Sequence, residues 1–220
     1  MTWSEATLLV AGLLLVLLWG IWVFASRLDR LHRKVAASRA ALETQLVRRA
    51  SAAAELASSG LLDPVSSVLV GEAAWAALSA GGYGRAELIA AMPDLNAMIG
   101  PQDDGAHEAG FALHVESFED RDRTESELSR TVREALADPD EVDLMHREPP
   151  GDELIDALAA AWYRVQLARR FHNEAVSQTQ RVRRKALIRA LRLHGHAPVP
   201  QTVEIDDAWP EALRRLAGAA

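Results

Sequence analysis

The feature that most constrains this chain is an uncharged apolar run close to its beginning, Ala6 to Ser26 (ATLLVAGLLLVLLWGIWVFAS). About 20 apolar residues, rising 1.5 Å each in a helix, span the roughly 30 Å hydrocarbon core of a bilayer. Trp3 lies at one end of the run and Trp19 and Trp22 lie near the other, where indole rings favour the membrane interface. We therefore expect residues 6–26 to form a transmembrane helix after a short extracytoplasmic segment, residues 1–5.

Two other interpretations of the run stay open. A buried core helix would be equally apolar, although a chain of 220 residues has little room for one so uniform. A cleaved signal peptide would fit the small-x-small pattern Val23-Phe24-Ala25. Against cleavage, the start MTWSEA has no basic residue and carries Glu5, and the run exceeds the roughly 7–15 residues usual for a signal core.

The basic residues near the run predict its orientation. None precedes it, whereas four follow it at once: Arg27, Arg30, Arg33 and Lys34. The positive-inside rule then places the amino terminus outside and the rest of the chain in the cytoplasm. These residues would also suit anionic lipid head groups, although we take them first as topology determinants. Only Lys34 and Lys185 are lysines, and this arginine bias with abundant alanine suggests a GC-rich bacterial genome and a bacterial cell membrane.

Composition excludes several classes of protein. The absence of cysteine rules out a disulfide scaffold, a thiolate zinc site and a cysteine nucleophile. The formal net charge of −7 hides a pattern: residues 27–60 carry 7 basic and 3 acidic side chains, residues 61–160 carry 6 and 22, and residues 161–220 carry 11 and 5. Two basic segments therefore flank an acidic middle, and they would complement it across the surface of a bundle.

Apolar spacing and capping residues predict four helices after the membrane run. The first covers 27–58 and stops at Gly60, and the second begins at the N-cap Asp63 and ends by Gly81. The third begins at the capping-box pattern Thr124–Glu127 and ends near Ala137. The fourth runs from about Asp152 to Leu193. Its apolar and small residues follow steps of four and three, as in a coiled-coil seam: Leu154, Leu158, Ala161, Val165, Ala168, His172, Ala175, Thr179, Val182 and Ala186.

The remaining segments lack such periodicity. Residues 81–123 are long, polar and rich in glycine and acid, which favours a flexible acidic insertion. Residues 195–220 form a carboxy-terminal tail that starts extended because of its prolines and ends in a short helix near 208–217. The predicted fold class is all-α: one amino-terminal transmembrane helix, then an antiparallel bundle of three to four helices, built from residues 27–80 and 124–194, with the insertion between its two parts.

Three segments together resemble the LemA family. QLVRRASAAAELA (45–57) is similar to a Q-L-x-R-R helix, and ARRFHNEAV (168–176) is similar to an A-R-x-x-Y-N-x-A-V motif on the last long helix. ESELSRTVREALADPDEVDL (125–144) is similar to an E-L-x-x-A-L helix followed by a P-D-L turn at Pro139. His172 stands where that family usually has tyrosine, and 81–123 has no counterpart. The resemblance implies a membrane-anchored helical bundle and no enzymatic activity.

The resemblance singles out six positions: Arg48, Arg49, Arg169, Arg170, His172 and Asn173. We interpret them as structural or interaction residues. The first and last helices would run antiparallel, with the arginines pairing to acidic residues of the middle helices and Asn173 fixing the register of the seam. A ligand-binding role is the alternative.

Other candidate sites are weaker. The basic run 181–192 would suit nucleic acid or anionic lipid, yet no aromatic platform or nucleic-acid motif accompanies it, so we prefer a solvated helix end. His194 and His196 need a third metal ligand, which only Asp206 or Asp207 could supply. Nucleotide-binding loops, nucleophile elbows and zinc-protease motifs are missing from the sequence. We therefore expect no catalytic residue, metal or cofactor.

The sequence thus predicts a membrane-anchored interaction or scaffold module and not an enzyme. Its expected partners are the lipid bilayer, a protein and, as a further option, a second copy of the chain; nucleic acid is not expected. Two alternatives stay open: a membrane-tethered hydrolase acting on a charged small molecule, and an anionic-polymer binder using the basic run 181–192.

Overall fold

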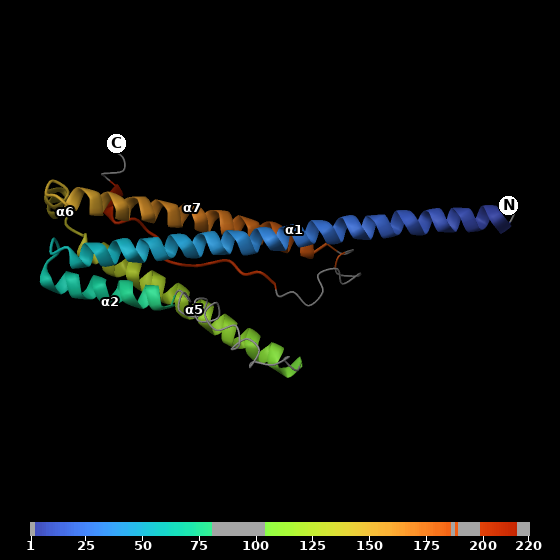
Figure 1. Ribbon diagram of the computed structural model, residues 1–220, viewed down its shortest axis with the longest axis horizontal. Helices are drawn as coiled ribbons and strands as arrows, with labels where there is room; N and C mark the ends of the chain where they lie inside the picture. Colours follow the sequence, from blue (N-terminus) through green and yellow to red (C-terminus); the bar gives the residue numbers. More distant parts are fainter. Residues whose placement is uncertain (1–2, 81–103, 186–187, 189–198, 215–220) are drawn as a thin grey trace, which may run out of the picture. The chain divides into compact units, whose positions relative to one another are not determined.

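The structure is a computed structural model that describes residues 3–80, 104–185, 188 and 199–214. The described helices are α1 Trp3–Ser58, α2 Pro64–Ala80, α5 Asp104–Ala135, α6 Pro139–Met145 and α7 Gly151–Arg183 (Figure 1). Residues 211–214 add one helical turn, and no strand occurs anywhere in these ranges. The predicted all-α fold class is therefore confirmed.

Local signals in the sequence explain where several helices begin and end. α1 ends at Ser58 and is followed by Gly60 at φ 80°, a backbone conformation that glycine adopts without a steric penalty. At the start of α2, the Asp63 carboxylate accepts hydrogen bonds from the backbone N–H groups of Val65 (2.9 Å) and Ser66 (3.2 Å). Pro64 follows at the first helical position, where its missing N–H costs nothing. These predicted ends are confirmed.

The first part of α1 is long and apolar enough to cross a bilayer. Only 6% of its most apolar window is buried, and its large side chains, such as Leu13 and Trp22, are exposed. A core helix of the same composition would bury most of these side chains. The same unbroken helix continues to Ser58, where its later residues, such as Leu46 and Leu56, are fully buried.

The chain divides into two compact units, which we describe separately. Unit 1 comprises residues 1–40 and 170–202, and unit 2 comprises residues 41–169 and 203–220. In unit 1, α7 runs antiparallel to α1, because His172 contacts Ser38 whereas the later Gln178 contacts the earlier Lys34. The buried residues of unit 1 include Leu28, His172, Ala175, Val176, Thr179 and Ile188.

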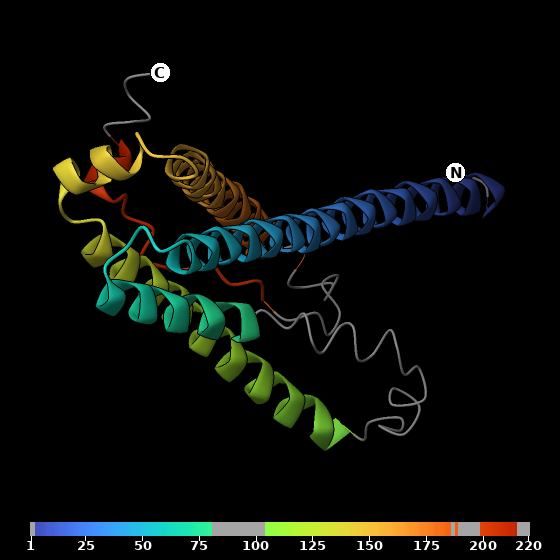
Figure 2. The ribbon, with the colours of Figure 1, turned by 60° about the vertical axis from the view of Figure 1, so that its left-hand side comes forward.

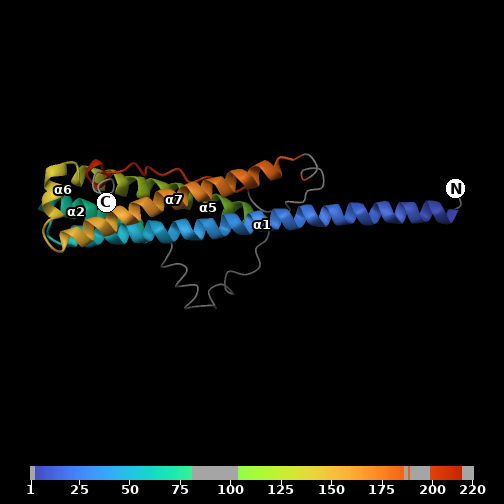
Figure 3. The ribbon, with the colours of Figure 1, turned by 90° about the horizontal axis from the view of Figure 1, so that it is seen from above.

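Unit 2 is a helical bundle around one main apolar core. The end of α1, α2, the second half of α5, α6 and the first half of α7 all contribute to it. Figure 2 shows α2 running alongside α5, and these two helices are in contact. Figure 3 shows α6 at the end of the bundle where α5 ends and α7 begins. The largest buried core side chains are Leu46, Leu56, Leu128, Leu136, Ile155, Leu158, Trp162 and Leu213.

Gly151 allows two backbone segments to meet at the start of α7. A Cβ atom at this position would lie 1.9 Å from the carbonyl oxygen of Met145, far inside the limit of real contacts. The Gly151 N–H also donates to the carbonyl of Glu148 at 2.6 Å. No other amino acid fits here without moving α6 away from α7.

The predicted start of the third helix is wrong. α5 begins at Asp104, twenty residues before the Thr124 capping pattern, so residues 104–123 are helical and are not a flexible insertion. No proline interrupts this stretch, and its alanine, glutamate and arginine residues favour helix. The Thr124 hydroxyl caps nothing, because it donates to the Asp120 carbonyl one turn earlier at 2.8 Å. Residues 81–103, the rest of the predicted insertion, lie outside the described residues.

Two further boundaries differ from the predictions. Pro139 and Asp140 begin the short helix α6 instead of a turn, capped by Asp138, whose side chain accepts from the Asp140 N–H at 2.9 Å. α7 ends at Arg183 and not at Leu193, which lies outside the described residues. The Asp138-Pro139 pair repeats the Asp63-Pro64 start signal of α2, so the sequence did carry the signal for α6.

Candidate functional site

The first candidate residue, Arg49, lies at the centre of unit 2 with none of its surface exposed. Its Nη2 donates to the Glu125 carboxylate (2.8 Å) and to the Glu125 carbonyl (3.1 Å), and its Nη1 donates to the Ser129 hydroxyl (2.9 Å). Glu125 and Ser129 are one turn apart on α5 and are also fully buried. The guanidinium therefore joins α1 to α5 through a charge-assisted network closed to water.

A second arginine extends this network. Arg121, one turn before Glu125 on α5, is also buried, and its Nη1 donates to the Ala77 carbonyl of α2 at 3.1 Å. Its Nη2 lies 2.9 Å from a Glu43 carboxylate oxygen and 3.2 Å from the free oxygen of Glu125. These two contacts are ion pairs and not hydrogen bonds, because neither carboxylate oxygen accepts a hydrogen bond from Nη2. Two cations thus face two anions, which makes the buried charge balanced.

Trp162 of α7 covers the other side of Arg49. Its indole ring centroid lies 4.9 Å from the guanidinium carbon, a cation–π distance, and the ring is fully buried. The indole N–H points elsewhere and donates to the backbone carbonyl of Asp207 at 3.0 Å. One side chain therefore links the α1–α5 network to the carboxy-terminal segment.

The carboxy-terminal segment enters unit 2 as an extended strip. Val203, Ile205 and Asp207 are buried while Glu204 and Asp206 are exposed, which is the two-residue alternation of an extended backbone. Beyond the strip, Ala212 and Leu213 complete the main core. Residues 195–198, the start of the predicted tail, lie outside the described residues; residues 199–210 form no helix, and residues 203–214 are an internal part of unit 2.

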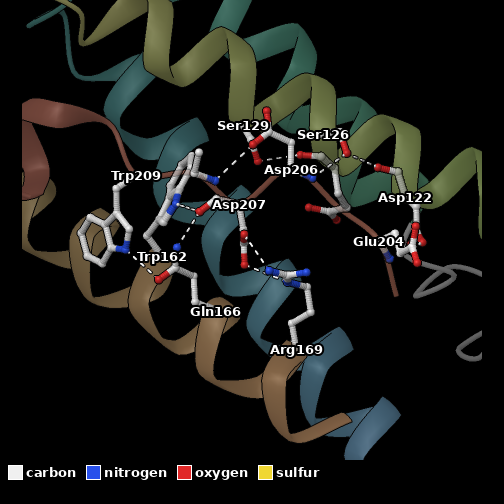
Figure 4. Close-up of polar contacts among 12 residues, drawn as sticks. Asp122, Ser126, Ser129, Trp162, Gln166, Arg169, Glu204, Asp206, Asp207 and Trp209 are labelled. Atoms are coloured by element: carbon white, nitrogen blue, oxygen red, sulfur yellow. Dashed lines mark hydrogen bonds and ion pairs between the residues drawn. The ribbon is translucent and has the colours of Figure 1, made fainter. Parts of the chain in front are cut away.

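Arg169 of α7 fixes this strip at Asp207. Its Nε and Nη2 donate to the two carboxylate oxygens of Asp207 at 2.8 and 2.9 Å. One turn earlier on α7, the Gln166 amide donates to the Asp207 carbonyl at 2.7 Å and accepts from the Trp209 indole N–H at 2.7 Å. Figure 4 shows these side chains converging on Asp207 from α7.

α5 holds the opposite edge of the strip through its exposed polar side chains. The Ser126 hydroxyl accepts from the Asp206 N–H at 3.0 Å, and the Asp122 carboxylate accepts from the Glu204 N–H at 3.3 Å (Figure 4). Arg133 pairs with both carboxylate oxygens of Asp206, and the hydrogen bond from Arg133 lowers the pKa of Asp206 below its usual value of 3.8. Backbone N–H groups that would meet a neighbouring strand in a sheet thus meet α5 side chains instead.

His172 is the polar member of the α1–α7 contact in unit 1. It is buried, and its Nδ1 lies 3.1 Å from the Ser38 hydroxyl oxygen. Because that hydroxyl donates its own proton to the Val35 carbonyl at 2.8 Å, Nδ1 must be the donor and Ser38 the acceptor. Thr179, two turns later, is buried as well and donates to the Ala175 carbonyl at 2.8 Å. Of the residues predicted for this half of the seam, Ala175 and Thr179 are therefore buried and Val182 is half-buried, while Ala186 lies outside the described residues.

The other candidate positions are less enclosed. Arg48 and Arg170 are exposed, and Asn173 is half-buried beside His172. Arg49 pairs with a middle helix, as the sequence suggested, but Arg169 pairs with the carboxy-terminal strip. The sequence reasoning missed Glu125, Trp162 and Gln166, and it considered Asp207 only as a metal ligand. The alternation V-E-I-D-D from Val203 was an available signal for a buried strip.

The charged groups of this arrangement are already paired with one another. Arg49, Arg121 and Arg169 each face a carboxylate at contact distance, so their charge is already neutralised within unit 2. Asp206 and Asp207, considered above as metal ligands, face Arg133 and Arg169. His194 and His196 lie outside the described residues, and across the described part no group of three or more potential metal ligands occurs. The geometry of these groups joins α1, α5 and α7 to one another and to the carboxy-terminal strip.

A second surface of unit 2, on α2, exposes apolar side chains. α2 buries Val70, Ala74 and Ala77 on one side, yet its opposite side is also apolar. That side, which we call the α2 face, consists of four apolar residues with more than half of their surface exposed: Val65 (67%), Val68 (62%), Leu69 (51%) and Trp75 (72%). A helix that is apolar on all sides is normally covered on all sides.

Comparisons with known proteins add no relative. No family model matches this chain, and neither a curated protein nor a solved structure matches it.

Proposed function

We propose that this chain is a single-pass membrane protein whose helical bundle binds a protein partner, and that it is not an enzyme. The observation that carries the proposal is the α2 face. An isolated exposed apolar residue is common on proteins, whereas Val65, Val68, Leu69 and Trp75 form a row on one side of a helix, interrupted by Glu72. Such rows mark surfaces that another macromolecule covers.

The composition of the α2 face fits a protein partner. Tryptophan is the residue type most enriched among the side chains that dominate binding energy, and Trp75 is the most exposed member of the row. The only charged residue on this side of the helix is Glu72. An amphipathic helix of the partner that presents its own apolar stripe would bury both surfaces.

The first part of α1 supports the membrane anchor. It combines sufficient length and apolarity with exposure of nearly all of its window. We propose that it crosses a bacterial cell membrane once, with the amino terminus outside and the residues after the apolar run in the cytoplasm, because every nearby basic residue follows it. We also propose divergent membership of the LemA family, on the resemblance of segments 45–57, 125–144 and 168–176 to that family.

The charged network supports a structural role over catalysis. A hydrolase acting on a charged small molecule would need arginines free to receive the substrate. Arg49 is fully buried beneath Trp162, and Arg169 holds both oxygens of Asp207. A substrate would have to displace a carboxylate of the chain itself.

Site-specific photo-crosslinking in cells tests the binding proposal. A photoreactive residue replaces Val68 or Trp75 on the α2 face of the full chain, and Glu127, an exposed polar position on α5, serves as the matched control. We expect a discrete protein adduct from positions 68 and 75 and none from position 127. Equal labelling at all three positions, or labelling at none, would remove the α2 face as a binding surface.

Cysteine labelling tests the topology, because the chain has no cysteine of its own. Single cysteines replace Ser4 and Ser58, and intact cells receive a membrane-impermeant maleimide. Labelling at position 4 alone is the expected result. Labelling at position 58 would place the bundle outside the membrane and would direct the partner search to the cell envelope.

A further inference from the structure

We propose that unit 1 binds anionic phospholipid head groups of the bilayer that α1 enters, through a basic cluster built from two segments far apart in the sequence. The cluster consists of exposed side chains of α1 and of the end of α7: Arg27, Arg30, Arg33, Lys34, Arg181, Arg184 and Lys185. This inference rests on the proposed membrane anchor and names the lipid class that the anchored protein recognises.

Contacts within unit 1 bring the two basic segments together. The Lys34 ammonium donates to the Gln178 amide oxygen at 3.3 Å, and Arg183 Nη1 lies 3.4 Å from His32 Nε2. With His172 against Ser38, these contacts give an antiparallel register in which rising numbers on α7 meet falling numbers on α1. The basic end of α7 therefore approaches the basic start of the α1 segment, although about 150 residues separate the two in sequence.

The same register places the end of α7 near the apolar run. His32 and Lys34 lie six to eight residues after Ser26, about 9–12 Å along a continuous helix. α7 ends at Arg183, which lies against His32, and Arg184 and Lys185 follow it directly. The head-group layer extends about 5–8 Å beyond the hydrocarbon core, so Arg27 and Arg30 lie within it and His32 and Lys34 lie just beyond it, where long basic side chains still reach the head groups.

The charge in this region is strongly positive and accessible. Residues 27–40 and 170–185 together carry ten basic and two acidic side chains, a net charge of +8 with histidine neutral. Asp29 is already paired with Arg33 on α1, and the Glu174 carboxylate accepts from Gln178 on α7. Eight basic side chains in these ranges are exposed, the seven of the cluster and Arg170, so the two acidic side chains do not balance the charge of the cluster.

Anionic lipid fits this cluster better than nucleic acid does. Juxtamembrane basic residues attract acidic head groups, and the effect adds up per residue. Single-stranded nucleic acid also requires aromatic stacking surfaces, and residues 27–34 and 178–185 contain no phenylalanine, tyrosine or tryptophan. The cluster directly follows an apolar helix. Together they match the anionic head groups and the apolar core of a bilayer.

The experiment uses the full chain reconstituted into phosphatidylcholine vesicles that contain a trace of spin-labelled lipid. The fraction of label immobilised by the protein gives its preference for phosphatidylglycerol over phosphatidylcholine. The test variant is Arg181→Gln/Arg184→Gln/Lys185→Gln, and the matched control is Arg130→Gln/Arg147→Gln/Arg164→Gln, three exposed positions of unit 2. Both remove three positive charges, and circular dichroism melting checks that both variants fold.

We expect the wild type and the control to share the same preference for phosphatidylglycerol. In the α7 variant we expect this preference to fall by about fivefold or more. An equal preference in all three proteins would overturn the inference. So would tight binding of a DNA duplex to these vesicles at about 150 mM salt that disappears in the α7 variant, because it would assign the cluster to nucleic acid. Failure of the chain to float with pure phosphatidylcholine vesicles would instead contradict the proposed anchor itself.

Discussion

Arg169 donates hydrogen bonds to both carboxylate oxygens of Asp207, with donor–acceptor distances of 2.8 and 2.9 Å. The two residues are 38 apart in sequence, one on α7 where the chain leaves unit 2 and one in the extended carboxy-terminal strip where it returns. This pair, with the Trp162 and Gln166 bonds to the Asp207 carbonyl, fixes the strip so that Leu213 reaches the core.

The Asp207→Ala variant tests this pair. The substitution removes both carboxylate acceptors and leaves Arg169 about one-quarter exposed to water, so we expect a loss of about 1–3 kcal/mol in the free energy of unfolding. Urea unfolding of the full chain in detergent, followed by circular dichroism, gives this value. Glu204→Ala is the control, because Glu204 is exposed in the same strip; equal effects of the two would mean that the ion pair contributes nothing.

The buried Arg49 makes a stronger prediction. Arg49→Met leaves the Glu125 carboxylate without its main partner in a site closed to water, so we expect a loss of about 3–5 kcal/mol in the free energy of unfolding. Arg48→Met, one residue earlier and exposed, is expected to change it by less than about 0.5 kcal/mol. The same urea titration compares the two variants. A tolerated Arg49→Met would show that Arg121 alone can hold Glu125.

Two glycines on helices predict opposite effects of the same substitution. Gly151→Ala forces a Cβ to within 1.9 Å of the Met145 carbonyl oxygen, so we expect destabilisation of about 1–3 kcal/mol. Gly71→Ala meets only Ala57 at 3.9 Å, an ordinary contact, and removes a flexible residue from the interior of α2, so we expect stabilisation of about 1 kcal/mol. Melting temperatures of the two variants, read against wild type, should therefore move in opposite directions. A stabilising Gly151→Ala would contradict the close approach of α6 and α7.

Acid should weaken the contact between Arg133 and Asp206. The hydrogen bond from Arg133 lowers the pKa of Asp206 in the folded protein relative to the usual 3.8. A carboxyl group with a lowered folded pKa stabilises the fold above its unfolded pKa, and this contribution is lost as pH falls from about 4 through the folded value. Asp206→Asn should therefore reduce the dependence of stability on pH below about 4, measured by urea unfolding at pH 3 to 6. Glu134→Gln, an exposed neighbour of Arg133 on α5, is the control and should leave the dependence unchanged.

The positions of helix ends followed from the sequence where the signal was local. Gly60, Asp63-Pro64 and the apolar steps of α7 act within a turn or two of the backbone, so their effect does not depend on the rest of the fold. The start of α5 was predicted wrongly because this prediction also rested on a local signal alone. A capping pattern such as Thr124–Glu127 also occurs inside a helix when the preceding residues favour helix, and the hydroxyl then bonds to a carbonyl one turn earlier.

What the sequence determined by itself is the all-α class and one apolar helix: an uncharged apolar run long enough for a bilayer, followed by helix-forming residues with periodic apolar positions. Only the tertiary structure decided which charged residues pair with each other. Arg49 meets Glu125 from 76 residues away, and Arg169 meets Asp207 from 38 residues away, although many carboxylates were available in the acidic middle. Charge attraction is long-ranged and tolerates many pairings. The choice among them follows from which helix faces pack together and from which charges that packing removes from water.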